Sequence, residues 1–210
     1  MVVFVRPAVA GVYEPYAEIR IRFTRVCRCP VAVVGPTVAG MPHFPYSTAG
    51  PALFAGLAVL AFGGIAVETS IVYPNVFHDV PDSLAEASEF FDVVGPGDVL
   101  PPLGAFTVLA GLVAVATAWR ITAARRWLVA GLLTLLGGEF LFSVLYFWPR
   151  NEIMFDEGTA VHSVEFLRRT ATEFETAHWV RLAVSAVTAL LAVTGFLRAY
   201  RQQVQREVAA

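Results

Sequence analysis

WLVAGLLTLLGGEFLFSVLYFWPRN, residues 127–151, is the stretch that decides the fold. From Trp127 to Trp148 it is apolar except for one carboxylic acid, Glu139, near its middle. A helix of these 22 residues is about 33 Å long, enough to cross a hydrocarbon core of about 30 Å. Tryptophans at both ends, followed by Pro149, are typical of a span that stops there. The stretch therefore predicts a membrane-spanning helix with an ionisable group inside it.

The composition of the whole chain agrees with a membrane protein. Of 210 residues, 57% are hydrophobic and 15% are charged, and the formal net charge is −2. That is too apolar for an ordinary soluble domain, and it offers no basic surface for nucleic acid. The two cysteines, Cys27 and Cys29, are too few for a disulfide framework. We therefore expect the lipid bilayer as partner, with a lipophilic small molecule or a membrane protein as further candidates and no nucleic acid.

Three more stretches have the length and hydropathy of membrane spans: Pro51–Tyr73, Pro101–Trp119 and Trp179–Tyr200. Together with residues 127–148 they predict an all-α fold, a four-helix transmembrane bundle with up-down-up-down topology over residues 50–201.

The two ends of the chain lie outside the predicted membrane domain. Residues 1–49 predict a cytoplasmic leader without regular structure, and residues 202–210 a cytoplasmic tail. A sharper hypothesis is that translation starts at Met41.

The two longer connecting segments, 75–99 and 149–178, are acidic, and each predicts an amphipathic helix. In the first segment, Ser83 and Glu86 fit a capping box that opens such a helix. In the second, apolar residues recur every three or four positions from Val164 and continue into the fourth span. We therefore expect that helix to run directly into the last span.

The distribution of arginine predicts the orientation. The leader and the 120–126 loop hold five and three arginines, and the C-terminal end of the chain holds three (Arg198, Arg201 and Arg206). Segments 75–99 and 149–178 hold none and three. The positive-inside rule then places both termini in the cytoplasm and the two acidic segments outside the cell membrane.

This topology gathers the unusual polar residues near the outer boundary. Glu68 lies about 9 Å, and Glu139 about 13 Å, inside the outer ends of their helices, from a rise of about 1.5 Å per residue. A carboxylate at the membrane centre costs at least about 2.5 kcal/mol, so each should face the bundle interior and find a partner. His178 and Arg181, from the fourth helix, are the natural partners.

A metal site finds little support in the sequence. Glu175-x-x-His178 has the spacing of one half of a carboxylate-bridged di-iron site, but no second Glu-x-x-His follows. We therefore predict no metal.

The short motifs at residues 73–75, 146–151 and 174–181 resemble those of the anthrone-oxygenase-like family of small four-span membrane proteins. The end of the third span, Tyr146-Phe-Trp-Pro-Arg-Asn151, resembles that family's Pro-x-Asn turn. Phe174-x3-His178-x2-Arg181 resembles its Trp-x3-His/Asn-x2-Arg, with Phe174 in place of tryptophan. Tyr73-Pro-Asn75 is similar to its first-helix exit. The resemblance covers about residues 50–200.

The resemblance implies an activity without a conventional cofactor. Fungal members of that family oxidise anthrones to anthraquinones with molecular oxygen, and most bacterial members have no assigned role. By resemblance, Asn151, His178 and Arg181 would be the site. On chemical grounds, His178 could act as the base that takes the acidic proton of an anthrone, and Arg181 with Asn151 could stabilise the resulting enolate. Glu139 is a further catalytic candidate, and Glu68, Asn75, Arg150 and Phe174 are substrate-binding candidates.

Two other functions fit the same sequence. The chain could be a non-catalytic partner or stability factor of a larger membrane complex, because its helix faces carry small residues. It could also be a proton-coupled transport subunit that uses Glu68 and Glu139. A cavity beside Glu139, His178 and Arg181 would favour chemistry, and a fully packed interior would favour the structural role.

Overall fold

A computed structural model describes residues 46–209, which form helices joined by turns and contain no strand. Four helices of this region are long and apolar enough to cross a membrane: Ser47–Val76, Pro96–Thr117, Thr122–Val161 and Val164–Ala209. The predicted all-α four-helix bundle is confirmed, and the chain is a multi-pass membrane protein by these features. The predictions for the leader and for a start at Met41 lie outside the described residues.

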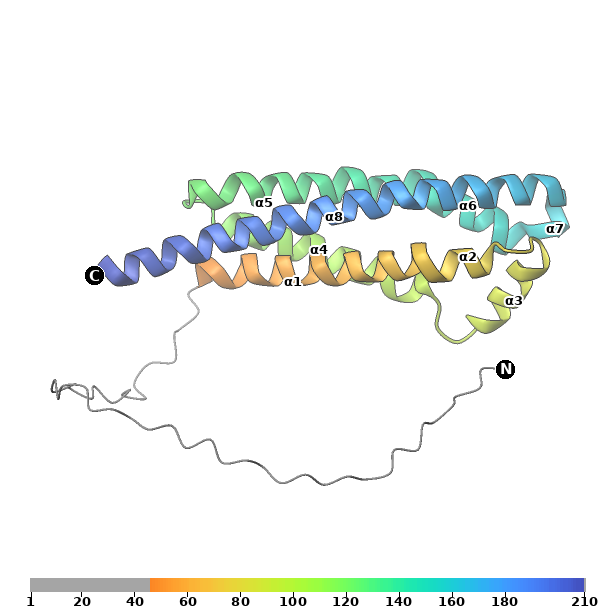
Figure 1. The fold of residues 1–210 in the computed structure, drawn as a ribbon, viewed down its shortest axis with the longest axis horizontal. Coiled ribbons are helices and arrows are strands. Elements are labelled where there is room, and N and C mark those ends of the chain that lie inside the picture. The colour runs from red at the N-terminus through yellow and green to blue at the C-terminus, as the bar shows by residue number, and fades with distance from the viewer. Residues whose placement is uncertain (1–45, 210) are drawn as a thin grey trace, which may run out of the picture. The chain divides into compact units, whose positions relative to one another are not determined.

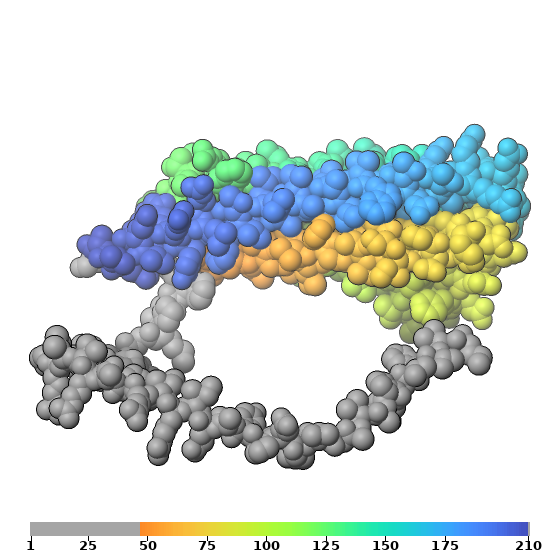
Figure 2. Space-filling model, in the orientation of Figure 1, coloured from red at the N-terminus to blue at the C-terminus, as the bar shows by residue number. Residues whose placement is uncertain are grey.

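The four helices pack as neighbours around a closed ring (Figure 1). α1 (Tyr46–Val67) packs along both α4 (Pro96–Thr117) and α8 (Val164–Ala209). α5 (Thr122–Thr134) packs along α8 and, over a shorter length, along α4. Figure 2 shows the surfaces of α1 and α8 side by side. Each helix therefore runs antiparallel to the one before it, and the last returns beside the first.

The bundle has two halves that differ in character (Figure 1). We call proximal the half that holds the start of α1, the turn between α4 and α5, and the end of α8. We call distal the half that holds α3 (Asp82–Phe90), α6 (Trp148–Asn151) and α7 (Gly158–Val161).

The proximal half is a tightly packed apolar core. Its centre is built from alanines of all four helices around Phe54 and Leu128, both 0% exposed. Glycines bring the helices together here: a Cβ added to Gly195 would lie 2.5 Å from Leu128 Cδ2, and one added to Gly111 would lie 2.9 Å from Leu132 Cδ1. Small residues at helix contacts are the usual device for close packing in a membrane, where water supplies no driving force.

The distal half contains π-helical segments within both the first and the third membrane helix. They are Glu68–Val72, Leu135–Leu141, Ser143–Phe147 and Glu152–Glu157. A π-helical turn inserts one extra residue into an α-helix and is found often at functional sites. The two buried glutamates, Glu68 and Glu139, both belong to such segments.

The prolines at the distal end do not stop their helices, contrary to the sequence prediction. The third helix continues through Pro149 to Val161, and the first continues past Pro74 to Val76. A proline ring clashes with the carbonyl four residues earlier in a regular α-helix. Here a wider π-helical turn precedes each proline, which we take to relieve that clash: Trp148 N–H bonds the Ser143 carbonyl, and Tyr73 N–H bonds that of Glu68.

The amphipathic helices of the connecting segments also form. α3 buries Leu84 and Ala87 against the bundle, but it begins at Asp82, so Ser83 is not its N-cap; the Ser83 hydroxyl instead accepts a hydrogen bond from Asp79 N–H. α8 runs unbroken from Val164 through the predicted tail to Ala209, as a single helix. The prediction that the fourth span continues an amphipathic helix is therefore confirmed.

Candidate functional site

Three helices bring the polar residues of the membrane region together in the distal half. Glu68 comes from the first helix, Glu139 from the third, and His178 and Arg181 from one face of α8. Glu68 is 5% exposed, Glu139 7% and His178 0%, and Arg181 is half-buried. The charge of Arg181 acts on both carboxyl groups. One guanidinium between two carboxyl groups can offset one full negative charge, which lowers the cost of burying them.

His178 is enclosed by aromatic rings and bonded through both ring nitrogens. The ring centroids of Tyr73, Phe147 and Phe174 lie 4.5, 5.1 and 5.7 Å from that of the imidazole. His178 Nδ1 lies 2.8 Å from the Thr69 hydroxyl, and Nε2 lies 3.2 Å from Arg181 Nη1. The imidazole is therefore held in place on all sides.

The Glu68 carboxyl is only half satisfied. Tyr73 donates its hydroxyl hydrogen to Glu68 Oε1 at 3.2 Å. Glu68 Oε2 lies 3.9 Å from His178 Nε2 and has no hydrogen-bond partner among the described residues. Since buried polar atoms are normally paired, this oxygen belongs to an incompletely bonded site.

The Glu139 carboxyl is in a similar state. The Thr188 side chain of α8 is a neighbour of this carboxyl group, whose Oε1 atom is buried without a partner in the described region. The Glu139 carbonyl, within the π-helical segment, accepts a hydrogen bond from the Ser143 hydroxyl at 2.6 Å. The backbone here is thus satisfied, but the carboxyl retains one free acceptor, and Arg181 Nε is a buried donor without a partner.

A cavity of about 210 Å³ lies against these two residues. Glu139 and Arg181 are its charged lining residues, and Thr107 and Ser143 add hydroxyl groups. The rest of the wall is apolar. It comes from α1, from residues 100–108 of α4 and from the third helix: Ala61, Ile65, Leu100, Pro101, Leu103, Gly104, Val108, Leu135, Phe140 and Trp148. An apolar pocket with a few convergent polar groups is the usual form of a small-molecule site.

The mouth of the cavity lies between α4 and the third helix. The exposed residues of its wall are Pro101 on α4 and Phe140 and Trp148 on the third helix. α4 packs against α5, which is the first part of the third helix, but hardly against the π-helical segment that follows it. This leaves the gap. Glu139 lies about 13 Å along the helix from Trp148, so this gap opens at the depth of the apolar span.

The predicted site residues fall into two groups. Glu68, Glu139, His178 and Arg181 come together as the sequence suggested, and Phe174 packs on His178 and Tyr73. Of this group, Glu139 and Arg181 line the cavity, and the other three predicted residues lie outside both the group and the cavity wall. Asn75 is exposed and donates to the Ile71 carbonyl; Asn151 lines a separate pocket with Tyr73, Phe91 and Asp156. Arg150 is engaged elsewhere.

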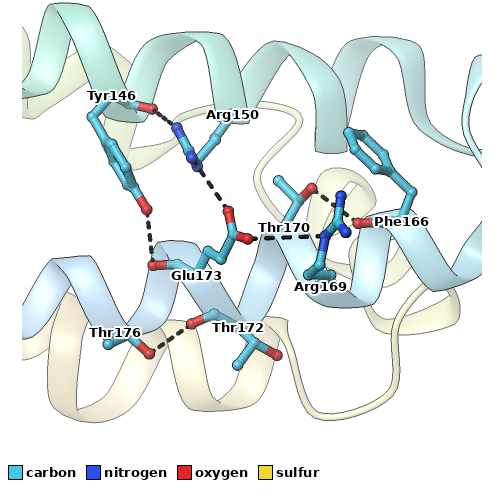
Figure 3. Close-up of polar contacts among 8 residues, drawn as sticks. All are labelled: Tyr146, Arg150, Phe166, Arg169, Thr170, Thr172, Glu173 and Thr176. Atoms are coloured by element: carbon cyan, nitrogen blue, oxygen red, sulfur yellow. Dashed lines mark hydrogen bonds and ion pairs between the residues drawn. The ribbon is translucent and has the colours of Figure 1, made fainter.

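Arg150 belongs to a clamp at the distal surface (Figure 3). Its guanidinium lies 3.6 Å above the Tyr146 ring, donates to the Tyr146 carbonyl at 3.2 Å, and pairs with Glu173 of α8 at 3.3 Å. Arg169 also approaches Glu173, at 3.9 Å, and the Tyr146 hydroxyl donates to the Glu173 carbonyl. These contacts tie the third helix to α8, which explains Arg150 without a ligand.

Sequence reasoning missed three residues that complete the site: Thr69, Tyr73 and Thr188. One signal for Thr188 was present, because His178, Arg181, Ser185 and Thr188 recur every three or four residues and so form a polar stripe on one face of a span. Thr69 and Tyr73 are one turn apart on the first helix, next to Glu68.

Among residues 46–209, no three His, Cys, Asp or Glu side chains gather in a way that could hold a metal ion. Comparisons of the chain with protein families, with curated proteins and with solved structures gave no match.

Proposed function

We propose that this membrane protein binds a lipophilic aromatic ketone in the distal cavity and oxidises it with molecular oxygen. The observation that carries the proposal is the position of Glu139 and Arg181 in the wall of one largely apolar cavity within the span. A structural bundle has no need of an unpaired carboxylate oxygen beside a cavity, because such a group costs stability. The motif resemblance to anthrone-oxygenase-like proteins supports the same class of substrate.

The chemistry follows from the two charged groups. Anthrone carries a methylene between two aromatic rings and opposite a ketone. Glu139 takes a proton from this methylene, and the electron pair moves to the ketone oxygen, where the Arg181 guanidinium stabilises the enolate. From the sequence we expected His178 to be the base, but Glu139 lines the cavity and His178 does not.

Oxygen then completes the reaction without a further reductant or oxidant. The enolate passes an electron to O2, the two radicals join in a C–O bond, and the proton returns to give a hydroperoxide. Loss of water breaks the O–O bond and the remaining C–H bond and forms the new C=O. One O2 is consumed and one water is released for each methylene converted to a ketone.

The orientation forms part of the proposal. The arginine-rich leader, the 120–126 loop and the tail support cytoplasmic termini, by the positive-inside rule. The distal half then belongs to the outer half of the cell membrane, and the substrate reaches the cavity from the outer leaflet.

Oxygen uptake tests the proposal. The full-length protein is placed in lipid nanodiscs with anthrone, and both O2 consumption and anthraquinone formation are followed. We expect one O2 per anthraquinone, and a loss of kcat of at least about 100-fold in Glu139→Gln, because proton abstraction by a positioned base contributes about 10²–10⁴-fold.

Glu173→Gln is the matched control, since it makes the same change at a carboxylate outside the cavity. It should leave kcat unchanged. Turnover by Glu139→Gln at the wild-type rate would exclude Glu139 as the base, and no uptake by the wild-type protein would refute the proposed oxidation.

A further inference from the structure

The hydrogen bonds around His178 define its protonation state. Arginine carries only donors, so the Arg181 Nη1–H group must donate to Nε2, and Nε2 must be the unprotonated nitrogen. The ring hydrogen is then on Nδ1, which faces the Thr69 hydroxyl at 2.8 Å. Thr69 can accept this hydrogen because its own hydroxyl hydrogen goes to the Ile65 carbonyl at 2.7 Å. Each donor in this chain meets one acceptor.

We infer that Thr69 and His178 are positioning residues that hold Arg181 toward the cavity. The chain of bonds begins at a backbone carbonyl of the first helix, passes through Thr69 and the imidazole, and ends at the guanidinium one turn further along α8. Arg181 is also held from the other side, because its guanidinium carbon lies 5.3 Å from the Phe147 ring centroid. The inference rests on the proposed function only in the role that Arg181 has in the cavity. The bonds that hold Arg181 do not depend on that role.

The burial of His178 supports this role over that of a proton acceptor. At 0% exposed, His178 is not part of the cavity wall. In the neutral ring, the lone pair on Nε2 accepts the hydrogen bond from Arg181. A proton added to Nε2 would remove that bond and place two positive charges side by side. A neutral imidazole with a fixed tautomer is the form that a positioning residue needs.

The test uses substitutions that remove the Thr69 acceptor. Thr69→Val deletes the hydroxyl and keeps the branched shape, and Thr69→Ser restores the hydroxyl. Thr170→Val is the matched control, because Thr170 is also buried and its hydroxyl also donates to the carbonyl four residues earlier, but it lies apart from the site. All variants are made in the full-length chain in lipid bilayers.

The first readout is the nitrogen-15 spectrum of the histidine rings, in which His178 is assigned by its contacts with the Phe174 and Tyr73 rings. In the wild-type, Thr69→Ser and Thr170→Val proteins we expect a neutral ring with the hydrogen on Nδ1. In Thr69→Val we expect the hydrogen to appear on Nε2 in a measurable fraction of molecules, because Nδ1–H has lost its acceptor. A wild-type ring protonated on Nε2, or a Thr69→Val spectrum identical to that of Thr170→Val, overturns the inference.

The second readout is anthrone turnover. A loosened Arg181 should lower kcat about tenfold in Thr69→Val with KM within about twofold, and Thr69→Ser should recover it. A tautomer change without any loss of kcat contradicts the positioning role. If the wild-type protein does not oxidise anthrone, the proposed function fails, and the ring spectrum still decides whether Thr69 sets the tautomer.

Discussion

The proximal and distal halves of the bundle are built from the same four helices but by different rules. The proximal half uses regular α-helix, alanine and glycine, and leaves Phe54 and Leu128 completely buried. The distal half uses π-helical turns, aromatic side chains and buried acids, and leaves a cavity of about 210 Å³. One half is packed for stability, and the other keeps costly groups that packing alone does not require. This difference is the reason that we place the proposed chemistry in the distal half.

The largest expected effect is a loss of anthrone oxidation when Arg181, in the distal half, is replaced. Arg181→Gln removes the charge between the two carboxyl groups and the stabiliser of the enolate. Since the loss of one such group costs about 10²–10³-fold in kcat, we expect a fall of that size in anthrone oxidation, with the bundle still folded. Arg150→Gln, in the surface clamp, should retain the wild-type rate. Similar rates of anthrone oxidation in Arg181→Gln and Arg150→Gln would contradict the proposal that the cavity arginine acts in the reaction and the clamp arginine does not.

The next effect concerns stability and belongs to the proximal half. A Cβ at Gly195 meets the side chain and backbone of Leu128, so Gly195→Ala should destabilise the protein by about 1–3 kcal/mol. A Cβ at Gly56 meets nothing within 4 Å, so Gly56→Ala should be neutral or stabilising by up to about 1 kcal/mol. Thermal unfolding in detergent measures both. Equal shifts in Tm for the two variants would contradict close packing at Gly195.

A smaller effect is expected at Thr188, whose side chain is a neighbour of the Glu139 carboxyl and can accept or donate one hydrogen bond there. Thr188→Val should lower kcat by about tenfold or less, because one hydrogen bond is worth about 0.5–1.5 kcal/mol. Thr194→Val loses only an intrahelical bond on an exposed face of α8 and is the control. A kcat for Thr188→Val that matches this control would mean that Thr188 does not orient the base.

The smallest effect is expected at the clamp. Glu173→Ala removes the ion pair with Arg150. The Arg150 side chain is 25% exposed and the Glu173 side chain is 48% exposed. Exposed ion pairs contribute about 0–1 kcal/mol, so the midpoint of thermal unfolding should move little. A loss of several degrees would show that the distal end depends on the clamp for its fold.

The fold, and the gathering of four polar residues in the distal half, could be predicted from the sequence for physical reasons. Unbroken apolar stretches near 20 residues allow few structures other than membrane helices, and acids inside them must meet partners. The structure places Glu68, Glu139, His178 and Arg181 together in the distal half, as these two constraints predict.

The errors arose where local rules were overridden. Pro149 reads as a helix stop, but the π-helical turn before it lets the helix continue to Val161. Arg150 and Asn151, which we expected at the site, therefore lie on the continuing helix, outside the cavity wall. The roles of Thr69 and Tyr73 depend on which residues of the first helix face His178, and the π-helical turn changes that register.

The most direct test of the central claim is the equilibrium binding of anthraquinone, which lacks the oxidisable methylene, to the protein in nanodiscs. Gly104 lines the cavity and Gly137 lies exposed on the third helix, and a Cβ at either position meets nothing within 4 Å. We expect Gly104→Phe to fill the cavity and raise Kd by at least about tenfold, a loss of about 1.4 kcal/mol, while Gly137→Phe leaves Kd unchanged. Equal Kd values for the two variants would contradict the claim that the distal cavity is the binding site.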